Sequence, residues 1–221
     1  AISIIRVSGT EALACVKKIA KFLPSNPESH RVYYGHLQSV EVANGSADAL
    51  DEVLVTYFAQ GKSFTAEEAL EISCHGSPAI AGSILQQLVI AGARLAQKGE
   101  FTLRAFLNGR IDLVQAEGVL ALIQSQSAIS ARLALRQLKG GLSREIGQIE
   151  EKLSWILSRL EANIDFSAED IEFAPQNQIT DRMTEALASV QQLVSTYQAG
   201  RILRSELRVA LIGAPNVGKS S

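Results

Sequence analysis

Cysteine is scarce in this sequence, and other features that would restrict its function are missing too. The two cysteines, Cys15 and Cys74, are too few for a disulfide framework, so a reducing, cytoplasmic setting is expected. No run of about 18 apolar residues occurs, which excludes a membrane-spanning helix. The apolar residues 1–7 have no basic region before them and no cleavage-site pattern after them, so they are not a secretory signal.

An excess of charge of one sign is also missing. The net charge is -2, which argues against a uniformly basic nucleic-acid surface but leaves room for a local basic patch. Hydrophobic residues make up 47% of the chain, so a packed core is available and wholesale disorder is not expected. The 221 residues are enough for one large domain or two smaller ones.

Residues 1–110 mix strand and helix patterns and predict an α+β domain. β-branched or alternating segments predict strands at residues 2–7, 32–42, 52–58 and 69–75.

Two helices are expected within this region. Ser8 and Glu11 have the spacing of a capping box before a helix that Pro24 and Pro27 would end. Pro78 would open a second helix that runs to about residue 93.

Residues 111–206 have a different character and predict a bundle of three long helices. Asp112 is a suitable N-cap for a first helix to about residue 138, which Gly140 and Gly141 break. Residues 142–164 carry apolar side chains at nearly heptad spacing, and residues 179–197 have a single apolar face.

The last residues, 207–221, consist of an apolar strand pattern followed by the glycine loop Gly213-Ala-Pro-Asn-Val-Gly218-Lys219-Ser220. This order is typical of a P-loop, whose backbone N–H groups hold the phosphates of a nucleoside triphosphate. Lys219 would reach the β- and γ-phosphates, and the Ser220 hydroxyl would bind Mg²⁺. The alternative is a chance match, which the preceding strand pattern disfavours.

Several stretches, taken in order, resemble the MnmE family of tRNA modification GTPases, which is also called TrmE, and the resemblance covers essentially the whole chain. The sequence Asn-Val-Gly-Lys-Ser in the glycine loop is similar to the corresponding sequence of translation-factor-type GTPases. The other stretches are Ile5-Arg-Val-Ser-Gly9, Ser63-Phe-Thr65, Leu70-Glu-Ile72, His75-Gly76 and the long Gly99-Glu-Phe-Thr-Leu-Arg-Ala-Phe-Leu-Asn-Gly-Arg-Ile-Asp-Leu-Val-Gln-Ala-Glu117.

The resemblance implies a multidomain protein. Residues 1–110 would be an α+β domain for tetrahydrofolate binding and dimerisation, and residues 111–206 a central helical domain. Residues 207–221 would begin an inserted P-loop α/β GTPase domain, of which only the first strand and the P-loop are present.

The resemblance also implies an activity and partners. A homodimer would work with the flavoprotein MnmG (GidA) on the wobble uridine of certain tRNAs, adding an aminomethyl or carboxymethylaminomethyl group at carbon 5. A tetrahydrofolate derivative (5-formyl- or methylene-tetrahydrofolate) would supply the one-carbon unit, and hydrolysis of GTP would drive the conformational cycle. Potassium would promote pairing of the two GTPase domains.

Three residues match the family's folate site by position: Arg6, Glu71 and Arg110. A carboxylate such as Glu71 can accept two hydrogen bonds from a pterin ring, and arginines suit the carboxylates or formyl oxygen of a folate. The alternatives stay open. Arg6 and Glu71 could be a charged pair across neighbouring strands, and Arg110 could be a helix-end cation beside Asn108-Gly109.

The GTP site is carried over in the same way. By resemblance, Asn216 would bind potassium and Ser220 magnesium, while the switch regions that would hold catalytic residues are absent. The GTP-binding residues would be Asn216, Val217, Gly218, Lys219, Ser220 and Ser221.

One departure from the family pattern, and three residues with reactive or aromatic side chains, are expected to have structural roles. Ala66 stands where the family usually has glycine after Ser-Phe-Thr, which bears on the shape of that turn. Cys74 and His75 are neighbours on opposite faces of a strand and do not form a nucleophile–base pair. Trp155 is expected to pack between helices rather than to stack on a base.

Two other functions compete with this interpretation. The chain could belong to a one-carbon transferase that uses folate alone, or to a ribosome-associated or signalling GTPase whose N-terminal region is a scaffold.

Overall fold

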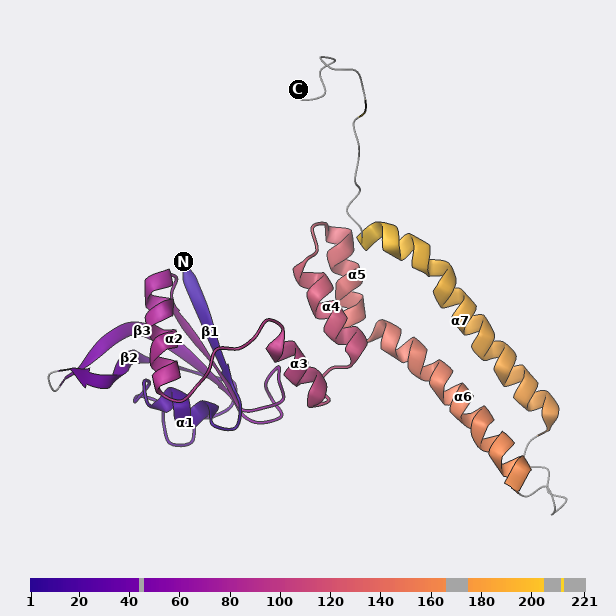
Figure 1. Cartoon of the computed structure of the whole chain (residues 1–221), viewed down its shortest axis with the longest axis horizontal. Coiled ribbons are helices and arrows are strands. Elements are labelled where there is room, and N and C mark those ends of the chain that lie inside the picture. The colour runs from indigo at the N-terminus through magenta and orange to yellow at the C-terminus, as the bar shows by residue number, and fades with distance from the viewer. Residues whose placement is uncertain (44–45, 166–174, 205–211, 213–221) are drawn as a thin grey trace. The chain divides into compact units, whose positions relative to one another are not determined.

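The computed structural model describes residues 1–43, 46–165, 175–204 and 212, with the backbone alone at 41–43, 46–48 and 197–204. The chain divides into two compact units, Ala1–Ala116 and Glu117–Ser221 (Figure 1). Each unit is described by itself. In the described ranges no helix is both long and apolar enough to cross a membrane.

The first unit is built on a four-stranded antiparallel sheet with the strand order β1-β4-β3-β2. Its strands are β1 (Ile2–Ser8), β2 (Arg31–Ala43), β3 (Ser46–Phe58) and β4 (Ala69–His75). All four strands predicted from the sequence are confirmed. β3 begins earlier than predicted because it pairs with β2 in a long hairpin that carries register shifts near Gln38.

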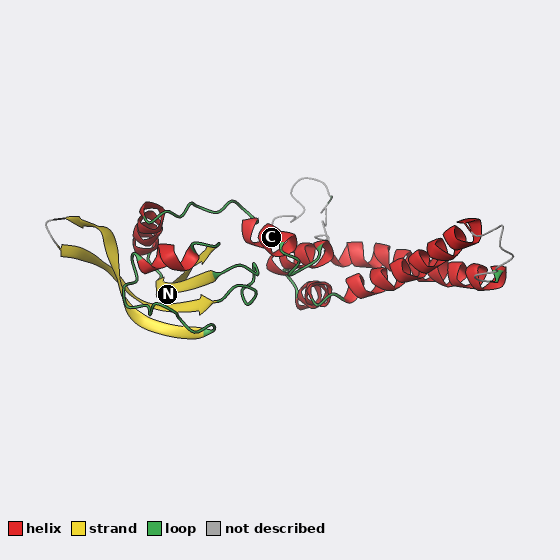
Figure 2. Cartoon of the chain, turned by 90° about the horizontal axis from the view of Figure 1, so that it is seen from below, coloured by secondary structure: helices red, strands yellow, loops and turns green. Residues whose placement is uncertain are grey.

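The core lies on one face of this sheet, under helices α1 (Ala12–Lys17) and α2 (Pro78–Ile90) (Figure 2). Strand alternation explains the division, since Ile5 and Ile72 point into the core while Ile4, next to Ile5, is 56% exposed. The other face therefore keeps large apolar side chains in solvent: Ile2, Ile4, Val32, Tyr34 and Leu54.

The start and end of α1 differ from the prediction. No capping box forms, because the Ser8 hydroxyl donates to Glu67 and bonds Thr65 instead of the helix start. The carboxylate of Glu68 accepts from the Leu13 backbone N–H at 3.0 Å and takes the place of a local cap. α1 ends at Lys17, well before the prolines, and the following residues pack into the core as turns.

The remaining elements of the described chain are helices, of which α3 lies in the first region and was not predicted, while helices were predicted for the second region. They are α3 (Glu100–Leu107), α4 (Leu113–Ile123), α5 (Ala128–Leu138), α6 (Gly141–Asp165) and α7 (Gln176–Arg204). An α+β region followed by a helical region is thus confirmed.

The prediction of a single helix from Asp112 to residue 138 is wrong. Asp112 is indeed the cap, since its Oδ1 accepts from the Gln115 N–H at 2.8 Å. The helix stops at Ile123, however, and a new one starts at a second cap. There Ser127 accepts from the backbone N–H of Ser130, and the Ser130 hydroxyl accepts from the Ser127 N–H.

The long helices α6 and α7 lie side by side in both cartoon views (Figures 1 and 2). Trp155 of α6 helps to join them, because the guanidinium of Arg182 on α7 lies 4.2 Å from its ring centroid. A second contact is the ion pair of Lys152 with Glu185 at 3.3 Å. Trp155 therefore packs between helices, as predicted.

Glycine allows α4 and α5 to approach closely. A Cβ built on Gly118 would lie 2.9 Å from the backbone nitrogen and 3.3 Å from the Cα of Leu138. Backbone atoms cannot rotate away, so this position has no room for a methyl group. Gly147 in α6 is the opposite case, with nothing within 4 Å of its built Cβ.

Two Gly→Ala substitutions in the same unit should therefore have opposite effects. Gly147→Ala should raise the free energy of unfolding by roughly 1 kcal/mol, because alanine is the better helix former. Gly118→Ala should lower it by about 1–3 kcal/mol through overpacking. Calorimetric melting of both variants tests this, and a stabilised Gly118→Ala variant would show that α4 does not pack against α5 as described.

Candidate functional site

Arg6 and Glu71 are register partners on neighbouring strands of the first unit. Arg6 Nε donates to Glu71 Oε1 at 2.7 Å, and the side chains are 58% and 32% exposed. The cross-strand charged pair that the sequence left open is thus present. Folate binding by the same residues stays a prediction, and the exposure of both groups leaves them accessible to a ligand.

Arg6 and Glu71 lie in the wall of a small recess of about 150 Å³. Two aromatic side chains contribute to the wall, Phe64 from the β3–β4 connection and Phe101 from α3, and Phe64 is 43% exposed. The recess therefore combines a charged pair with aromatic rings. Its complete lining is Arg6, Phe58, Ser63, Phe64, Thr65, Ala69, Leu70, Glu71 and Phe101.

Arg6 also borders a larger cavity of about 540 Å³. β1, α1 and α2 supply apolar side chains such as Leu85 and Leu88 to this cavity, and residues 92–96 with α3 close it. Arg94, Glu100 and Arg104 supply charge at its wall. A cavity of this size falls within the roughly 300–1,000 Å³ that small-molecule sites occupy.

A buried hydrogen-bond network fixes the segment that carries Phe64. Thr65 is 1% exposed, and its hydroxyl bonds Ser8 at 2.6 Å and Ser63 at 3.0 Å. Glu67 accepts from Ser8 at 2.8 Å and from Arg104 at 3.0 Å. Burial alone would raise the pKa of Glu67, but the bonds from Ser8 and Arg104 lower it below its ordinary value.

The turn that contains Ala66, where the family usually has glycine, has a left-handed backbone. Ala66 has φ of 60°, a conformation that glycine adopts without strain and alanine does not. The Gly61 N–H donates to the Ala66 carbonyl at 2.8 Å, which closes the loop around Phe64. The glycine-type turn is therefore kept despite the substitution.

Glu100 organises the charges beside the larger cavity. It accepts from Arg94 at 2.5 and 2.9 Å, from the Gln97 N–H at 2.8 Å and from Arg104 at 2.8 and 3.1 Å. The bonds from Arg94 first, then those from Gln97 and Arg104, lower the pKa of Glu100 to about 2. Arg104 thus bridges Glu100 and Glu67, and it ties α3 to the loop of the recess.

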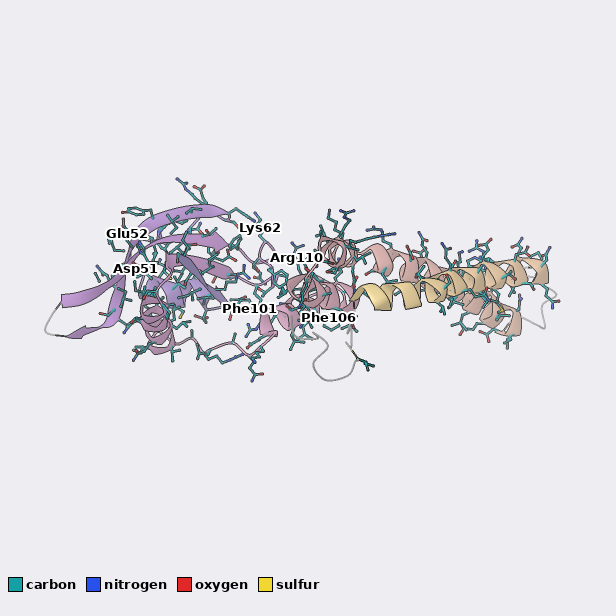
Figure 3. The ribbon with its side chains drawn as sticks, turned by 90° about the horizontal axis from the view of Figure 1, so that it is seen from above. Asp51, Glu52, Lys62, Phe101, Phe106 and Arg110 are labelled. Atoms are coloured by element: carbon teal, nitrogen blue, oxygen red, sulfur yellow. The ribbon has the colours of Figure 1, made fainter. Side chains whose placement is uncertain are left out.

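Arg110 is not brought together with the other two predicted folate residues. It is exposed, follows the left-handed Gly109 at the end of α3, and lines neither the recess nor the larger cavity. Figure 3 places it with Phe106 near α3, at a distance from Asp51 and Glu52. Its position fits the alternative of a helix-end cation, and its role in folate binding stays a prediction.

Other candidate residues are accounted for. The predicted GTP-site residues Asn216 to Ser221 lie outside the described residues. Cys15 and Cys74 are buried, and burial raises the pKa of both thiols. His75 points out of the sheet and bonds Asp51 at 2.8 Å. Among the described residues no group of three or more His, Cys, Asp or Glu side chains could hold a metal.

Reasoning from the sequence alone did not identify the roles of Phe64, Phe101, Glu100 and Arg104. The signal was present, since all four lie in the two stretches, 63–65 and 99–117, on which the family resemblance rests. What the sequence does not reveal is that Arg104 and Glu67, 37 residues apart, join these stretches.

The pKa of Glu100 gives a testable dependence on pH. A carboxyl whose pKa falls from 4.5 to about 2 on folding stabilises the fold above pH 4.5, and this contribution is lost as the pH falls towards 2. Glu100→Gln should therefore lower the melting temperature at pH 7, and its difference from the unmodified protein should shrink between pH 4.5 and 2.

Glu11→Gln is the matched control, because Glu11 lines the same cavity without an ion pair in the described part of the chain. A Glu100→Gln difference that stays constant over this pH range would contradict the role given to Glu100.

Comparisons with known proteins agree with this arrangement of parts. A family model described as "GTP-binding protein TrmE N-terminus" matches residues 1–110, and one described as "MnmE helical domain" matches residues 113–208. The recess and the larger cavity both fall within the first match.

Relatives named "tRNA modification GTPase MnmE" align with the whole chain. Those from Bdellovibrio bacteriovorus, Moorella thermoacetica and Shouchella clausii are 55%, 45% and 43% identical over 220, 224 and 224 residues. The alignments cover 100% of this chain but only 45%, 47% and 48% of the relatives, so the chain spans about half their length. Since two family models match side by side and these relatives align throughout, the chain belongs to the MnmE (TrmE) family of tRNA modification GTPases.

Proposed function

We propose that the protein hydrolyses GTP and, with the flavoprotein MnmG, forms 5-carboxymethylaminomethyl or aminomethyl uridine at the tRNA wobble position. A folate-derived one-carbon unit is the donor, the protein is a cytoplasmic homodimer, and the domains are residues 1–110, 111–206 and a GTPase domain from 207. The observation that carries the proposal is the alignment of the whole chain with relatives named tRNA modification GTPase.

The GTP half of the proposal rests on the glycine loop. Gly213 and Gly218 let the main chain approach the phosphates, and Lys219 supplies a cation for their charge. Magnesium at Ser220 and potassium at Asn216 would neutralise further charge as the phosphate bond breaks. These roles come from the sequence, because the loop lies outside the described residues.

The folate half rests on the recess. A pterin ring is flat and presents adjacent donors, which suit the Glu71 carboxylate together with the aromatic side chains of Phe64 and Phe101 in the same lining. At about 150 Å³ the recess is too small for a whole folate, but Arg6 also borders the cavity of about 540 Å³. The residues present thus fit a ring in the recess and a longer, anionic remainder beyond Arg6.

Titration with 5-formyltetrahydrofolate tests the folate half. The intact protein should bind it, and Glu71→Gln should weaken binding by about 10- to 100-fold, the value of a hydrogen bond to a charged group. Arg110→Ala should weaken binding similarly if the predicted third residue takes part. Isothermal titration calorimetry measures all three.

Glu28→Gln is the control, because Glu28 is an exposed carboxylate paired with Arg31 and does not line either cavity. Absence of binding by the intact protein would remove folate from the proposal. Binding unchanged by Glu71→Gln would remove the recess.

Two rival functions make different predictions for Lys219→Ala in the intact protein. A one-carbon transferase that uses folate alone should tolerate the loss of this phosphate ligand, whereas tRNA modification driven by GTP should stop. A ribosome-associated GTPase should leave wobble nucleosides unchanged when its gene is deleted. Mass analysis of tRNA nucleosides from the deletion and Lys219→Ala strains should reveal unmodified wobble uridine in both, and modified uridine in either would refute the proposal.

A further inference from the structure

Positive charge is concentrated in one part of the helical unit. Between Glu117 and Glu145 the sequence contains no acidic residue and four basic ones, in a chain whose net charge is -2. All four basic side chains are exposed, and they lie on α5 and at the start of α6. These residues, Arg132, Arg136, Lys139 and Arg144, are called the α5–α6 corner.

The fold brings the four cations together. Arg132 and Arg136 on α5 and Lys139 at its C-cap follow one another at four- and three-residue spacing, so they lie along one side of this helix and its end. A tight turn at Gly140, with φ of 74°, then joins the two helices (Figure 1). Across this turn Arg144 Nη1 donates to the Lys139 carbonyl at 3.1 Å. This bond holds Arg144, the first basic residue of α6, beside the basic residues at the end of α5.

The turn itself is closely packed. A Cβ on Gly141 would lie 3.1 Å from the Arg136 carbonyl oxygen and 3.3 Å from its Cγ. The Lys139 N–H donates to Leu135 O at 3.0 Å and the Gly140 N–H to Gln137 O at 2.9 Å, so the backbone at the end of α5 is closed by hydrogen bonds. The corner is therefore a defined surface rather than a loose run of charges.

Among the described residues of this unit, little neutralises the charge. Arg136 forms an ion pair with Glu145 at 4.0 Å, with side chains 77% and 49% exposed. A pair so long and so exposed contributes little to stability, and like charges at helical spacing repel.

The helix dipole explains only part of the arrangement. Cations near the end of α5 are favourable, which covers Arg136 and Lys139. Arg132 lies earlier in that helix, and Arg144 stands in the first turns of α6, where the dipole disfavours a cation. Folding therefore accounts for part of this cluster, through the α5 dipole and the bond from Arg144 to the Lys139 carbonyl, but not for Arg132.

We propose that the α5–α6 corner binds the phosphate backbone of tRNA. This inference rests on the proposed function, which supplies tRNA as the polyanion. Three of the four cations are arginines, whose planar guanidinium pairs with phosphate oxygens through two hydrogen bonds. Contacts of this kind position an RNA without reading its sequence, so base recognition lies elsewhere.

Dependence of binding on salt is the test, because each phosphate contact releases counterions. Fluorescence anisotropy with the full-length protein and labelled tRNA should be measured from about 50 to 200 mM salt. The triple variant Arg132→Gln, Arg136→Gln, Lys139→Gln should reduce the slope of log K against log salt by about two, and weaken binding at low salt roughly 10- to 100-fold. Arg144→Gln alone should reduce the slope by about one.

The matched control is Lys21→Gln, Lys62→Gln, Lys98→Gln, which removes the same charge from exposed positions of the first unit. It should change affinity far less, and intrinsic GTP hydrolysis should be unchanged in both triple variants, which confirms that they fold.

Three outcomes would overturn the inference. The intact protein could bind tRNA while the corner triple variant binds it no more weakly than the control variant does. Together with an unchanged slope of log K against log salt for Arg144→Gln, this result would place the tRNA elsewhere. An intact protein that does not bind tRNA refutes the proposed function and this inference together. Normal tRNA binding with loss of an acidic protein partner would assign the corner to protein recognition.

Discussion

The register between β1 and β4 is the constraint on which the first unit depends. Ile5 pairs with Ile72 on the buried face, and Arg6 pairs with Glu71 on the open one. Because side chains alternate along a strand, a slip of one residue would place Arg6 in the core and Ile5 in solvent. Burial of the isoleucines therefore fixes the charged pair where the recess and the larger cavity meet, with β1 as their common wall.

The hydroxyl and carboxylate network adds a second constraint to the same strand. Ser8 at the end of β1 bonds Thr65 and Glu67, and Glu67 in turn accepts from Arg104 of α3. The buried Thr65 hydroxyl would be costly to leave unpaired, so these bonds hold the loop against β1. Phe64, between two buried residues, is held at the surface as a result. An exposed aromatic on a fixed loop is pre-organised for a flat ligand, because binding needs no ordering of the loop.

Local patterns predicted most of the elements, and the failure at the start of α1 has a long-range cause. The four strands and the helices α6 and α7 follow from alternation and near-heptad spacing, although Ile156 and Ala186 are the only buried hydrophobic side chains in the described parts of α6 and α7. The missing capping box of α1 does not follow from such patterns, because the groups that Ser8 and the helix start bond instead, Thr65 and Glu68, are more than 50 residues away. The cap at Ser127 is a local pattern, but the helix-forming residues around it favour the prediction of one continuous helix.

The candidate site shows the same division. Arg6 and Glu71 were named from the sequence, and both line the recess, whereas Arg110 lines neither cavity of the first unit. The links that assemble the site, from Ser8 to Glu67 and from Glu67 to Arg104, join residues 59 and 37 positions apart. No periodicity encodes such pairs, so a single sequence could name the chemistry but not the arrangement.

The treatment of charge differs between the two units, and this separates their proposed roles. In the first unit Arg94 and Arg104 are held by hydrogen bonds to Glu100 and Glu67, which also keep the pKa values of those carboxyls low. Guanidinium groups paired in this way bond a carboxylate in place of water. A long polyanion would have to displace that carboxylate, so it would gain little from binding there.

The cations of the α5–α6 corner face solvent, and their charge is opposed only by the distant contact with Glu145 among the described ion pairs. They can exchange water and counterions for phosphate without breaking a buried network. A near-neutral chain can thus keep a small-ligand site and a polyanion surface apart, because carboxylates hold Arg94 and Arg104 in the first unit whereas the arginines of the α5–α6 corner face solvent.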